Sequence, residues 1–395
     1  MKRILFYSEN FCGDKIKGGL EVATFRIAKA LKDSGDWEVY NVFRSKSDGK
    51  EKSIYSDVIK LGKADFKFRK ELAKFISDNE IDVVVNMSRF YRHPHIVKVV
   101  KESGRNVKII FMQHFAPGSE MKKPTFNSGF HLLKLNPYNP LYWLRSSIYP
   151  ILKLPRRFKF SNIYKSTYQD SDKVILLSGG YKDDYCKIGK ISDKSKFLAI
   201  PNIFEVESNA KSQVQRKEKR VLILSRMDEI QKRMSLALQI WAMIEKDPDL
   251  KDWQLDIVGS GHNEDIVKRL IRKLKLKNIT YHGWQPREDF LQKSSILMST
   301  SEYEGLPLAI LEAQAYGVVP IAFDSYASIR DVIEDGFNGV VIEHFGDCDT
   351  FAKKLANLMK DEKKRLQLAQ NAVNSSGKFS SEKIGNQWLE MLEKL

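Results

Sequence analysis

The sequence predicts an α/β protein with two domains, each built on a doubly wound parallel sheet. The chain has 395 residues, which is enough for two ordinary domains. Short apolar runs typical of buried parallel strands alternate along it with segments of helical period. A polar, charged stretch at 202–219 interrupts this alternation and is predicted to be a linker. The domains are therefore expected at 1–201 and 220–377, with a separate terminal helix at 378–395.

The first domain begins with a short buried strand, Ile4-Leu5-Phe6-Tyr7, and an amphipathic helix at 22–32. A second helix is predicted at 65–79. Further strands are expected where apolar and β-branched residues dominate short runs, at 37–43, 82–86, 107–112, 173–178 and 196–201.

The stretch at 117–162 is expected to be the least regular part of the chain because it contains several prolines. A helix at 141–154, interrupted at Pro150, is predicted within it. His93 and His95 have no Cys, Asp or Glu close enough to suggest a metal site, so they are expected on the surface or on the acceptor side.

The second domain repeats the alternation. Its predicted strands are the apolar runs at 220–224, 253–258, 279–282, 296–298, 318–323 and 340–342. Apolar residues at helical spacing predict its helices. These are expected at 234–244, 307–316, 327–333, 350–374 and 379–395. Pro307 suits the first turn of one helix, and Gly317 suits the position after its end.

The net charge of +16 is concentrated in the first half of the chain. Residues 1–200 carry 38 Lys and Arg against 21 Asp and Glu, whereas residues 201–395 carry 28 against 29. The segment at 121–169 contains nine Lys and Arg and no acid, mixed with aromatic residues and leucine. Three interpretations of this basic segment stay open. It could bind nucleic acid, it could contact an anionic membrane face, or it could be a solvated basic face without a partner.

No apolar run approaches the 18 residues of a membrane span, and the apolar run after Met1-Lys2-Arg3 is too short for a signal peptide. The three cysteines, Cys12, Cys186 and Cys348, are far apart. They predict a reduced, cytoplasmic setting with no zinc or disulfide framework.

Two carboxylates stand out at 301–321, SEYEGLPLAILEAQAYGVVPI, a predicted strand–loop–helix–strand unit. Glu304 lies in the loop, and Glu312 lies eight residues later in a helix with mostly apolar sides. A buried carboxylate needs a partner, and a ribose diol offers two neighbouring hydroxyl donors. The alternative is that Glu304 is a solvated loop residue and Glu312 an exposed helix residue.

The start of this helix is a predicted phosphate site, because helix N-termini present unpaired N–H groups and the positive end of the dipole. Pro307 has no N–H, so the expected donors are Gly305, Leu306, Leu308 and Ala309.

Two cations and a pair of glycines are further candidates. Arg226 and Lys232 lie near a helix start after a strand, where they can hold a diphosphate, Arg bidentately and Lys as a point charge. Exposed cations without a ligand are the alternative. Gly18-Gly19 would let the backbone approach a ligand closely, or form a plain tight turn.

Two positions after predicted strands complete the candidates. His114 follows the strand at 107–112, at the edge where open α/β sheets place ligands, unless it is a packed loop histidine. Gly259-Ser260-Gly261 follows another strand, but it lacks the third glycine and the downstream acidic residue of a dinucleotide site, so NAD is not expected.

The segment EGLPLAILEAQAYGVVPIA resembles the E-x7-E signature of retaining glycosyltransferases of family 4, which have the GT-B fold. The resemblance covers nearly the whole chain and is strongest over 220–346. It implies two Rossmann-like domains facing a cleft, with the nucleotide sugar on the second domain and the acceptor on the first. It also implies that the terminal helix crosses back to the first domain.

The resemblance assigns roles residue by residue. Glu312 would hold the nucleotide ribose, and Glu304 would lie by the donor sugar. Arg226 and Lys232 match the family's diphosphate cations. His114 matches a histidine that often lies near the donor sugar.

Glycines and one loop are matched as well. Gly18 and Gly19 match a GG-x-E loop facing the donor phosphates, and Gly259 belongs to a loop beside the nucleotide. Backbone groups of Trp284 and Gln285 would read the base. The chain departs from the pattern around Arg226 and Lys232, since Ser225 and Arg233 stand where the family has glycines.

The implied reaction is transfer of a hexosyl unit, with retention, from a nucleotide sugar to a hydroxyl of a glycan or lipid-linked oligosaccharide in cell-envelope polysaccharide synthesis. Glu304, His114, Arg226 and Lys232 would act on the reacting groups, with no metal and no cofactor besides the donor. A UDP-sugar is the expected donor and GDP-mannose the second candidate. The enzyme would be cytoplasmic, with the 121–169 segment as a candidate contact to the inner membrane face.

Two other functions are alternatives. Another GT-B enzyme, such as a nucleotide-sugar epimerase, would convert the donor without an acceptor, whereas a phosphorylase would need a cofactor lysine for which no motif is visible. A basic nucleic-acid-binding protein would show salt-dependent binding that survives loss of Glu304 and Glu312. The resemblance disfavours nucleic acid as a partner.

Overall fold

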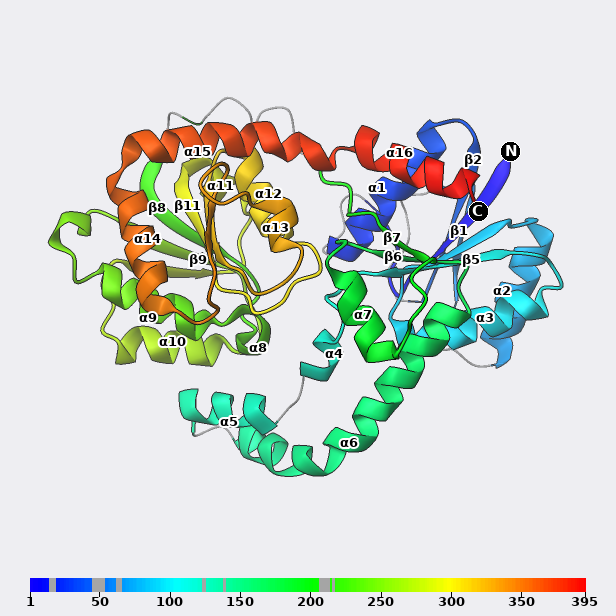
Figure 1. The fold of residues 1–395 in the computed structure, drawn as a ribbon, viewed down its shortest axis with the longest axis horizontal. Coiled ribbons are helices and arrows are strands. Elements are labelled where there is room, and N and C mark those ends of the chain that lie inside the picture. The colour runs from blue at the N-terminus through cyan, green and yellow to red at the C-terminus, as the bar shows by residue number, and fades with distance from the viewer. Residues whose placement is uncertain are drawn as a thin grey trace. The chain divides into compact units, whose positions relative to one another are not determined.

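The computed structural model describes residues 1–13, 19–44, 54–61, 66–122, 126–137, 140–205, 214 and 217–395. They form two compact units, each with a parallel sheet that has helices on both faces (Figure 1). Unit 1 comprises Met1–Gly118, Arg156–Glu205 and Phe379–Leu395, and unit 2 comprises Ser119–Pro155 and Val206–Lys378.

Unit 1 has a seven-stranded parallel sheet in the order β3-β2-β1-β4-β5-β6-β7, the crossover order of a Rossmann-like sheet. Its strands are β1 Lys2–Tyr7, β2 Trp37–Phe43, β3 Asp57–Lys60, β4 Val83–Asn86, β5 Lys108–Gln113, β6 Lys173–Leu176 and β7 Phe197–Ala199. Its helices include α1 Gly19–Asp33, α2 Phe66–Asp78, α3 His93–Glu102, α7 Tyr181–Gly189 and α16 Ser381–Glu393.

The terminal helix α16 packs on α1 within unit 1. A Cβ at Gly385 would lie 3.2 Å from the Cβ of Ala30, so the two helices approach closely at this glycine. Trp388 is fully buried, and its ring centroid lies 6.4 Å from that of Phe6 on β1. The last helix therefore adds to the core formed by the first strand.

The prediction for His93 was wrong, because this residue begins α3 and is fully buried. Its Nδ1 lies 3.2 Å from Asn86 Nδ2, and its Nε2 lies 3.0 Å from Ser171 Oγ. The Ser171 hydroxyl donates to the Thr167 carbonyl, so the ring carries its proton on Nε2 and accepts from Asn86 at Nδ1. Burial lowers the pKa of His93 to about 3, and the ring is a neutral structural group. His95, on the same helix, is exposed.

The irregular stretch predicted at 117–162 is largely helical, which corrects that expectation. It contains α4 Ser119–Lys122 and α5 Phe126–Leu135, and α6 runs without a break from Pro140 to Gln169. Pro150 removes one backbone hydrogen bond from this 30-residue helix but does not end it. No helix among the described residues is long and apolar enough to cross a membrane.

Unit 2 has a six-stranded parallel sheet in the order β10-β9-β8-β11-β12-β13. Its strands are β8 Glu218–Leu224, β9 Gln254–Val258, β10 Ile279–Gly283, β11 Ser294–Ser299, β12 Val319–Phe323 and β13 Val340–Ile342. The helices after the first strand are α8 Glu229–Lys232, α9 Met234–Ile244, α10 Glu264–Lys273, α11 Glu288–Lys293, α12 Leu308–Ala315, α13 Ile329–Val332, α14 Cys348–Lys360 and α15 Glu362–Ser375.

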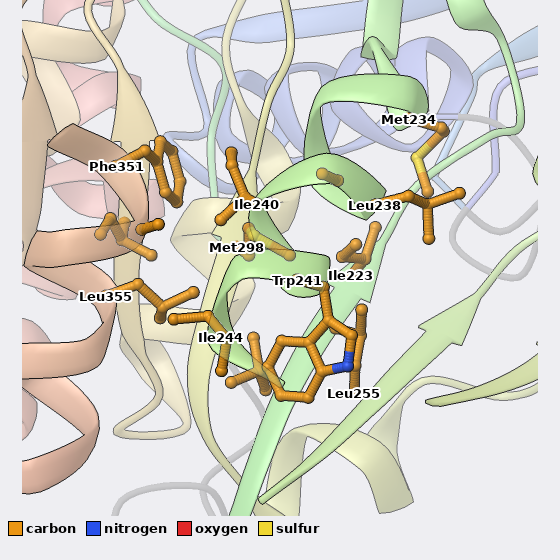
Figure 2. Packing of buried hydrophobic residues seen from close by; sticks show 14 of the residues in the cluster. Ile223, Met234, Leu238, Ile240, Trp241, Ile244, Leu255, Met298, Phe351 and Leu355 are labelled. Atoms are coloured by element: carbon orange, nitrogen blue, oxygen red, sulfur yellow. The ribbon is translucent and has the colours of Figure 1, made fainter. Parts of the chain in front are cut away.

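The core of unit 2 lies between the sheet and the helices α9, α10 and α14. Figure 2 shows Trp241 and Ile244 of α9 beside Leu255 of β9, with Phe351 and Leu355 of α14 in the same cluster. These side chains are almost completely buried, and burying each large apolar side chain contributes about 1.5–3 kcal/mol. This core fixes the strands whose carboxyl ends carry the candidate site.

Helix α5 belongs to unit 2, although the sequence places it inside the predicted first domain of 1–201. Leu132 and Leu133 are buried in the unit 2 core. His131 Nε2 lies 2.9 Å from the buried carboxylate of Glu229, and Asn136 Nδ2 donates to Asp265 at 2.6 Å. The predicted first domain, 1–201, therefore differs from unit 1, because α5 is encoded in the first half of the chain but packs into the core of unit 2.

Candidate active site

Four loops meet at one edge of the unit 2 sheet, where the adjacent parallel strands β10, β9, β8 and β11 end. The segment 284–287 follows β10, 259–263 follows β9, 300–307 follows β11, and 225–233, which contains the short helix α8, follows β8. Ligands of open α/β sheets bind at the carboxyl ends of strands. Most of the site residues predicted from the sequence lie on these loops.

Glu304 is held by the side-chain donors of Lys232, Gln231 and Ser301 and is not a solvated loop residue. Its side chain is 13% exposed and forms an ion pair with Lys232 Nζ. Gln231 Nε2 donates to its Oε2 at 3.0 Å, and Ser301 Oγ donates to its Oε1 at 2.8 Å. The structure therefore brings together two predicted residues, Glu304 and Lys232, which are 72 positions apart.

The loops after β8 and β11 are joined through their backbones as well. The Glu302 N–H donates to the Gln231 carbonyl at 2.7 Å. The Thr300 hydroxyl lies 2.9 Å from the Lys232 carbonyl oxygen and 3.1 Å from that of Arg233. These bonds fix the position of Lys232 relative to Glu304.

Arg233 takes a backbone conformation that suits glycine, and it stands where the resembled family has glycine. Its φ of 50° lies in the left-handed region, which costs roughly 1–2 kcal/mol for an L-residue. Its Nε donates to Glu302 Oε2 at 2.7 Å, so an ion pair with the neighbouring loop offsets this strain. The substitution therefore keeps the loop shape.

Arg226 is exposed, and its Nη2 donates to Gln231 Oε1 at 3.0 Å. The amide of Gln231 thus lies between Arg226 and Glu304. Gln231 was not singled out from the sequence, where its local signal is its place directly before Lys232.

Gly259 is required by close packing between two loops. Its φ is +132°, and a Cβ on it would lie 1.9 Å from the carbonyl oxygen of Ser225. A Cβ on Gly261 would lie 2.6 Å from the Met227 carbonyl oxygen. These glycines hold the loop after β9 against the loop that carries Arg226, and a contact of Gly259 with nucleotide stays a prediction.

Glu312 is largely buried on α12, and Arg287 Nη1 lies 2.7 Å from its Oε1. The alternative that Glu312 is an exposed helix residue is therefore wrong. Arg287 follows β10 and was not singled out from the sequence, because nothing in its local pattern links it to a residue 25 positions later.

The start of α12 offers fewer free donors than predicted. The N–H of Leu308 donates to the Leu306 carbonyl at 2.9 Å, so it is already engaged. Within the described part of the chain, the N–H groups of Gly305, Leu306 and Ala309 donate to no backbone carbonyl. These three remain the candidate phosphate donors.

Trp284 and Gln285 are exposed on the loop after β10, where the base was predicted to bind. Beneath this loop, the buried carboxylate of Asp256 is held between Arg220 Nη1 and His282 Nε2, each at 2.8 Å. This cluster, also missed from the sequence, stabilises the strands that carry the loop.

The remaining predicted residues belong to unit 1. His114 follows β5, and both its ring nitrogens are buried without a hydrogen-bond partner among the described residues. Burial lowers the pKa of His114 to about 4, so its ring is neutral at neutral pH. Gly19 is the first residue of α1, and Glu21 in its first turn accepts from Asn10 Nδ2 at 2.6 Å. Gly18 lies outside the described residues.

No cluster of three or more His, Cys, Asp or Glu side chains suited to a metal ion is present in the described ranges. Reaction without a metal stays a prediction, as do the individual roles of the site residues.

Comparison with known proteins finds a family similarity in the second half of the chain. Residues 205–375 match the family model of the glycosyl transferases group 1. The chain is 30% identical over 179 residues to the amylovoran biosynthesis glycosyltransferase AmsD of Erwinia amylovora. The aligned region covers 45% of this chain and 49% of AmsD. The chain thus spans about half the length of this relative.

Two further comparisons cover more of the chain. It is 25% identical over 308 residues to the Campylobacter jejuni enzyme named GalNAc-alpha-(1->4)-GalNAc-alpha-(1->3)-diNAcBac-PP-undecaprenol alpha-1,4-N-acetyl-D-galactosaminyltransferase, covering 77% of this chain and 79% of that enzyme. The crystal structure of Anabaena HepE in complex with UDP and glucose matches with a TM-score of 0.72 at 16% identity, covering 100% of both chains. These neighbours confirm the GT-B fold with two Rossmann-like parallel-sheet domains.

Proposed function

Because the chain carries a glycosyl transferase group 1 domain on a GT-B fold, we propose that it transfers a hexosyl unit from a nucleotide sugar to a hydroxyl of a glycan or lipid-linked oligosaccharide. The reaction proceeds with retention at the anomeric carbon and without a metal. The observation that carries this proposal is the network joining Arg226, Lys232 and Glu304 beside the start of α12.

The donor is a UDP-sugar. HepE, whose fold matches, was crystallised with UDP and glucose, which supports UDP over GDP. Glu312 binds the ribose hydroxyls, which share its carboxylate with Arg287 or displace the Arg287 guanidinium 2.7 Å away. The backbone groups of Trp284 and Gln285 bind the base. Gly259 and Gly19 belong to loops that lie beside the nucleotide.

The chemistry depends on stabilising the leaving diphosphate. As the bond from the anomeric carbon to the diphosphate oxygen breaks, negative charge grows on the diphosphate. Arg226, Lys232 and the free N–H groups at the start of α12 stabilise this charge. The acceptor oxygen bonds to the anomeric carbon from the same face, and its proton passes to the departing diphosphate oxygen. Glu304 contacts donor-sugar hydroxyls, and the neutral ring of His114 orients the donor.

The acceptor is a glycan or a lipid-linked oligosaccharide of the cell envelope. Support comes from the relatives named for amylovoran biosynthesis and for an undecaprenol-linked substrate. On α6, within the basic segment 121–169, Trp143 and Leu144 are exposed, which suits peripheral contact with an anionic membrane on its cytoplasmic side. Flotation with anionic and with neutral vesicles tests this contact, and equal binding to both would contradict it.

The test of the donor site is binding without metal. Thermal shifts are measured with UDP, GDP and ADP, because a ligand of the folded state raises stability with its concentration. We expect stabilisation by UDP that is lost in Glu312→Ala. Release of UDP from UDP-hexoses is then followed, and Glu304→Gln should lower it by at least about 100-fold if the carboxylate contacts the sugar in the transition state. No shift with any of these nucleotides would overturn the proposal.

A further inference from the structure

We infer that Gln231 is a positioning residue that links the diphosphate cation Arg226 to the donor-sugar carboxylate Glu304. The inference rests on the proposed function of these two residues. Gln231 itself matches none of the positions assigned from the resemblance. Its side chain is buried between the loops after β8 and β11.

The amide of Gln231 has one orientation that satisfies its neighbours. Its Nε2 donates to Glu304 Oε2 at 3.0 Å and to the Tyr303 carbonyl at 3.2 Å, while its Oε1 accepts from Arg226 Nη2 at 3.0 Å. A flipped amide would place oxygen against two acceptors and an NH2 group against a guanidinium donor, and all three bonds would be lost. The neighbours therefore fix which end faces Glu304.

The backbone of Gln231 is fixed as well, so the amide is aimed by both loops. Its N–H donates to Asp228 Oδ1 at 3.3 Å, and its carbonyl accepts from Glu302 N–H at 2.7 Å. A buried side chain on a fixed backbone can set the angle of the carboxylate that it contacts.

Gln231 and Lys232 contact different oxygens of Glu304. Oε1 receives Lys232 and Ser301, whereas Oε2 receives Gln231. A diphosphate would attract the Lys232 ammonium and weaken its hold on Glu304. The neutral amide of Gln231 is not drawn to phosphate in this way, so it keeps Glu304 oriented toward the sugar while the donor is bound.

The test compares the affinity for UDP with the affinity for UDP-hexoses, measured by calorimetry on the full-length protein. The probes are UDP, UDP-glucose, UDP-galactose and their N-acetyl derivatives, and the best-bound sugar is used. Gln231→Met removes all three side-chain hydrogen bonds of Gln231 at similar volume. We expect it to reduce the advantage of UDP-hexose over UDP by roughly 10-fold, because a hydrogen bond to a charged group is lost.

A second variant tests the contact of Gln231 with Glu304 separately from its contact with Arg226. Gln231→Glu keeps an oxygen facing Arg226 but places another against Glu304. We expect UDP to bind more weakly, because the new carboxylate competes with the diphosphate for Arg226. The UDP-hexose advantage should be lost by about 10-fold or more in addition, since like charges repel at this distance. Retention of the full advantage in Gln231→Glu would overturn the inference.

A double-mutant cycle shows whether Gln231 acts through Glu304. In the Glu304→Ala background, Gln231→Met should change the UDP-hexose advantage by less than about 2-fold, because its partner is already absent. The matched control is Gln314→Met, which removes a buried glutamine of α12 whose side-chain amide donates to the Val332 carbonyl at 3.0 Å. This control should lower the melting temperature without changing the UDP-hexose advantage.

The outcomes distinguish the two proposals. A wild type that binds neither UDP nor any UDP-hexose overturns the proposed function and this inference with it. A wild type that binds them, with Gln231→Met and Glu304→Ala acting independently, overturns only the role of Gln231.

Discussion

Arg287 Nη1 lies 2.7 Å from Glu312 Oε1, so an ion pair covers the carboxylate that we assign to the nucleotide ribose. The Glu312 side chain is 13% exposed, whereas that of Arg287 is 52% exposed. A carboxylate this deeply buried is costly without a counter-charge, and Arg287 supplies one from the loop after β10. A ribose that reaches Glu312 must share or displace this pair.

Arg287→Ala should therefore tighten UDP binding. The ribose would no longer compete with the guanidinium, and a half-exposed ion pair is worth about 0.2–1 kcal/mol, which corresponds to roughly 1.5–5-fold in Kd. Calorimetric titration with UDP measures this change, with Arg287→Lys as the charge-retaining control. Weaker binding in Arg287→Ala would instead show that Arg287 contacts the nucleotide.

Substitutions of Arg233 should separate its backbone strain from its ion pair. Arg233→Ala loses the contact with Glu302 and keeps the left-handed conformation, so it should be destabilising. Arg233→Gly loses the same contact but removes the strain, and it should be more stable than the alanine variant by about 1 kcal/mol. Midpoints of denaturant unfolding compare the two variants. Equal midpoints would mean that the left-handed conformation carries no cost at this position.

Gly259→Ala should disable the donor site. Its Cβ would clash with the Ser225 carbonyl oxygen, and its φ of +132° is rarely adopted by other residues. We expect loss of UDP binding or of soluble protein. Gly336→Ala is the matched control, because Gly336 also has positive φ but nothing lies within 4 Å of its Cβ position. The control should cost only about 1 kcal/mol of stability and bind UDP normally.

The sequence predicted elements whose signals are local. The helix expected at 234–244 coincides with α9, and the strand expected at 340–342 coincides with β13. Gly317 ends α12 with a φ of +67°, as expected for a glycine after a helix. Strong periodicity and specific terminal residues made these elements predictable.

Other features depend on contacts between distant segments and could not be predicted. Gln231 and Glu304 are 73 positions apart, so only the folded loops reveal their hydrogen bond. Helix α5 packs in unit 2 through Leu132 and Leu133, although linear order places it in the first half. The pattern around His93 does not show that Asn86 and Ser171 satisfy its ring. Tertiary contacts decide each of these positions.

Acid should destabilise the protein through its buried neutral histidines, and His93 is the clearest case. Its pKa is about 3 in the folded protein, against 6.5 for an ordinary histidine, so the unfolded chain binds more protons between these values. Stability from this residue is therefore fully present above about pH 6.5 and is lost as the pH falls toward 3. His93 alone should lower the free energy of unfolding by about 1.4 kcal/mol at about pH 5.5 relative to about pH 7.5.

Denaturant unfolding of the full-length protein at both pH values measures this difference in the free energy of unfolding. His93→Gln should show a smaller pH dependence than the wild type. The exposed His95→Gln on the same helix should behave like the wild type, and an unchanged pH dependence in His93→Gln would contradict the assignment.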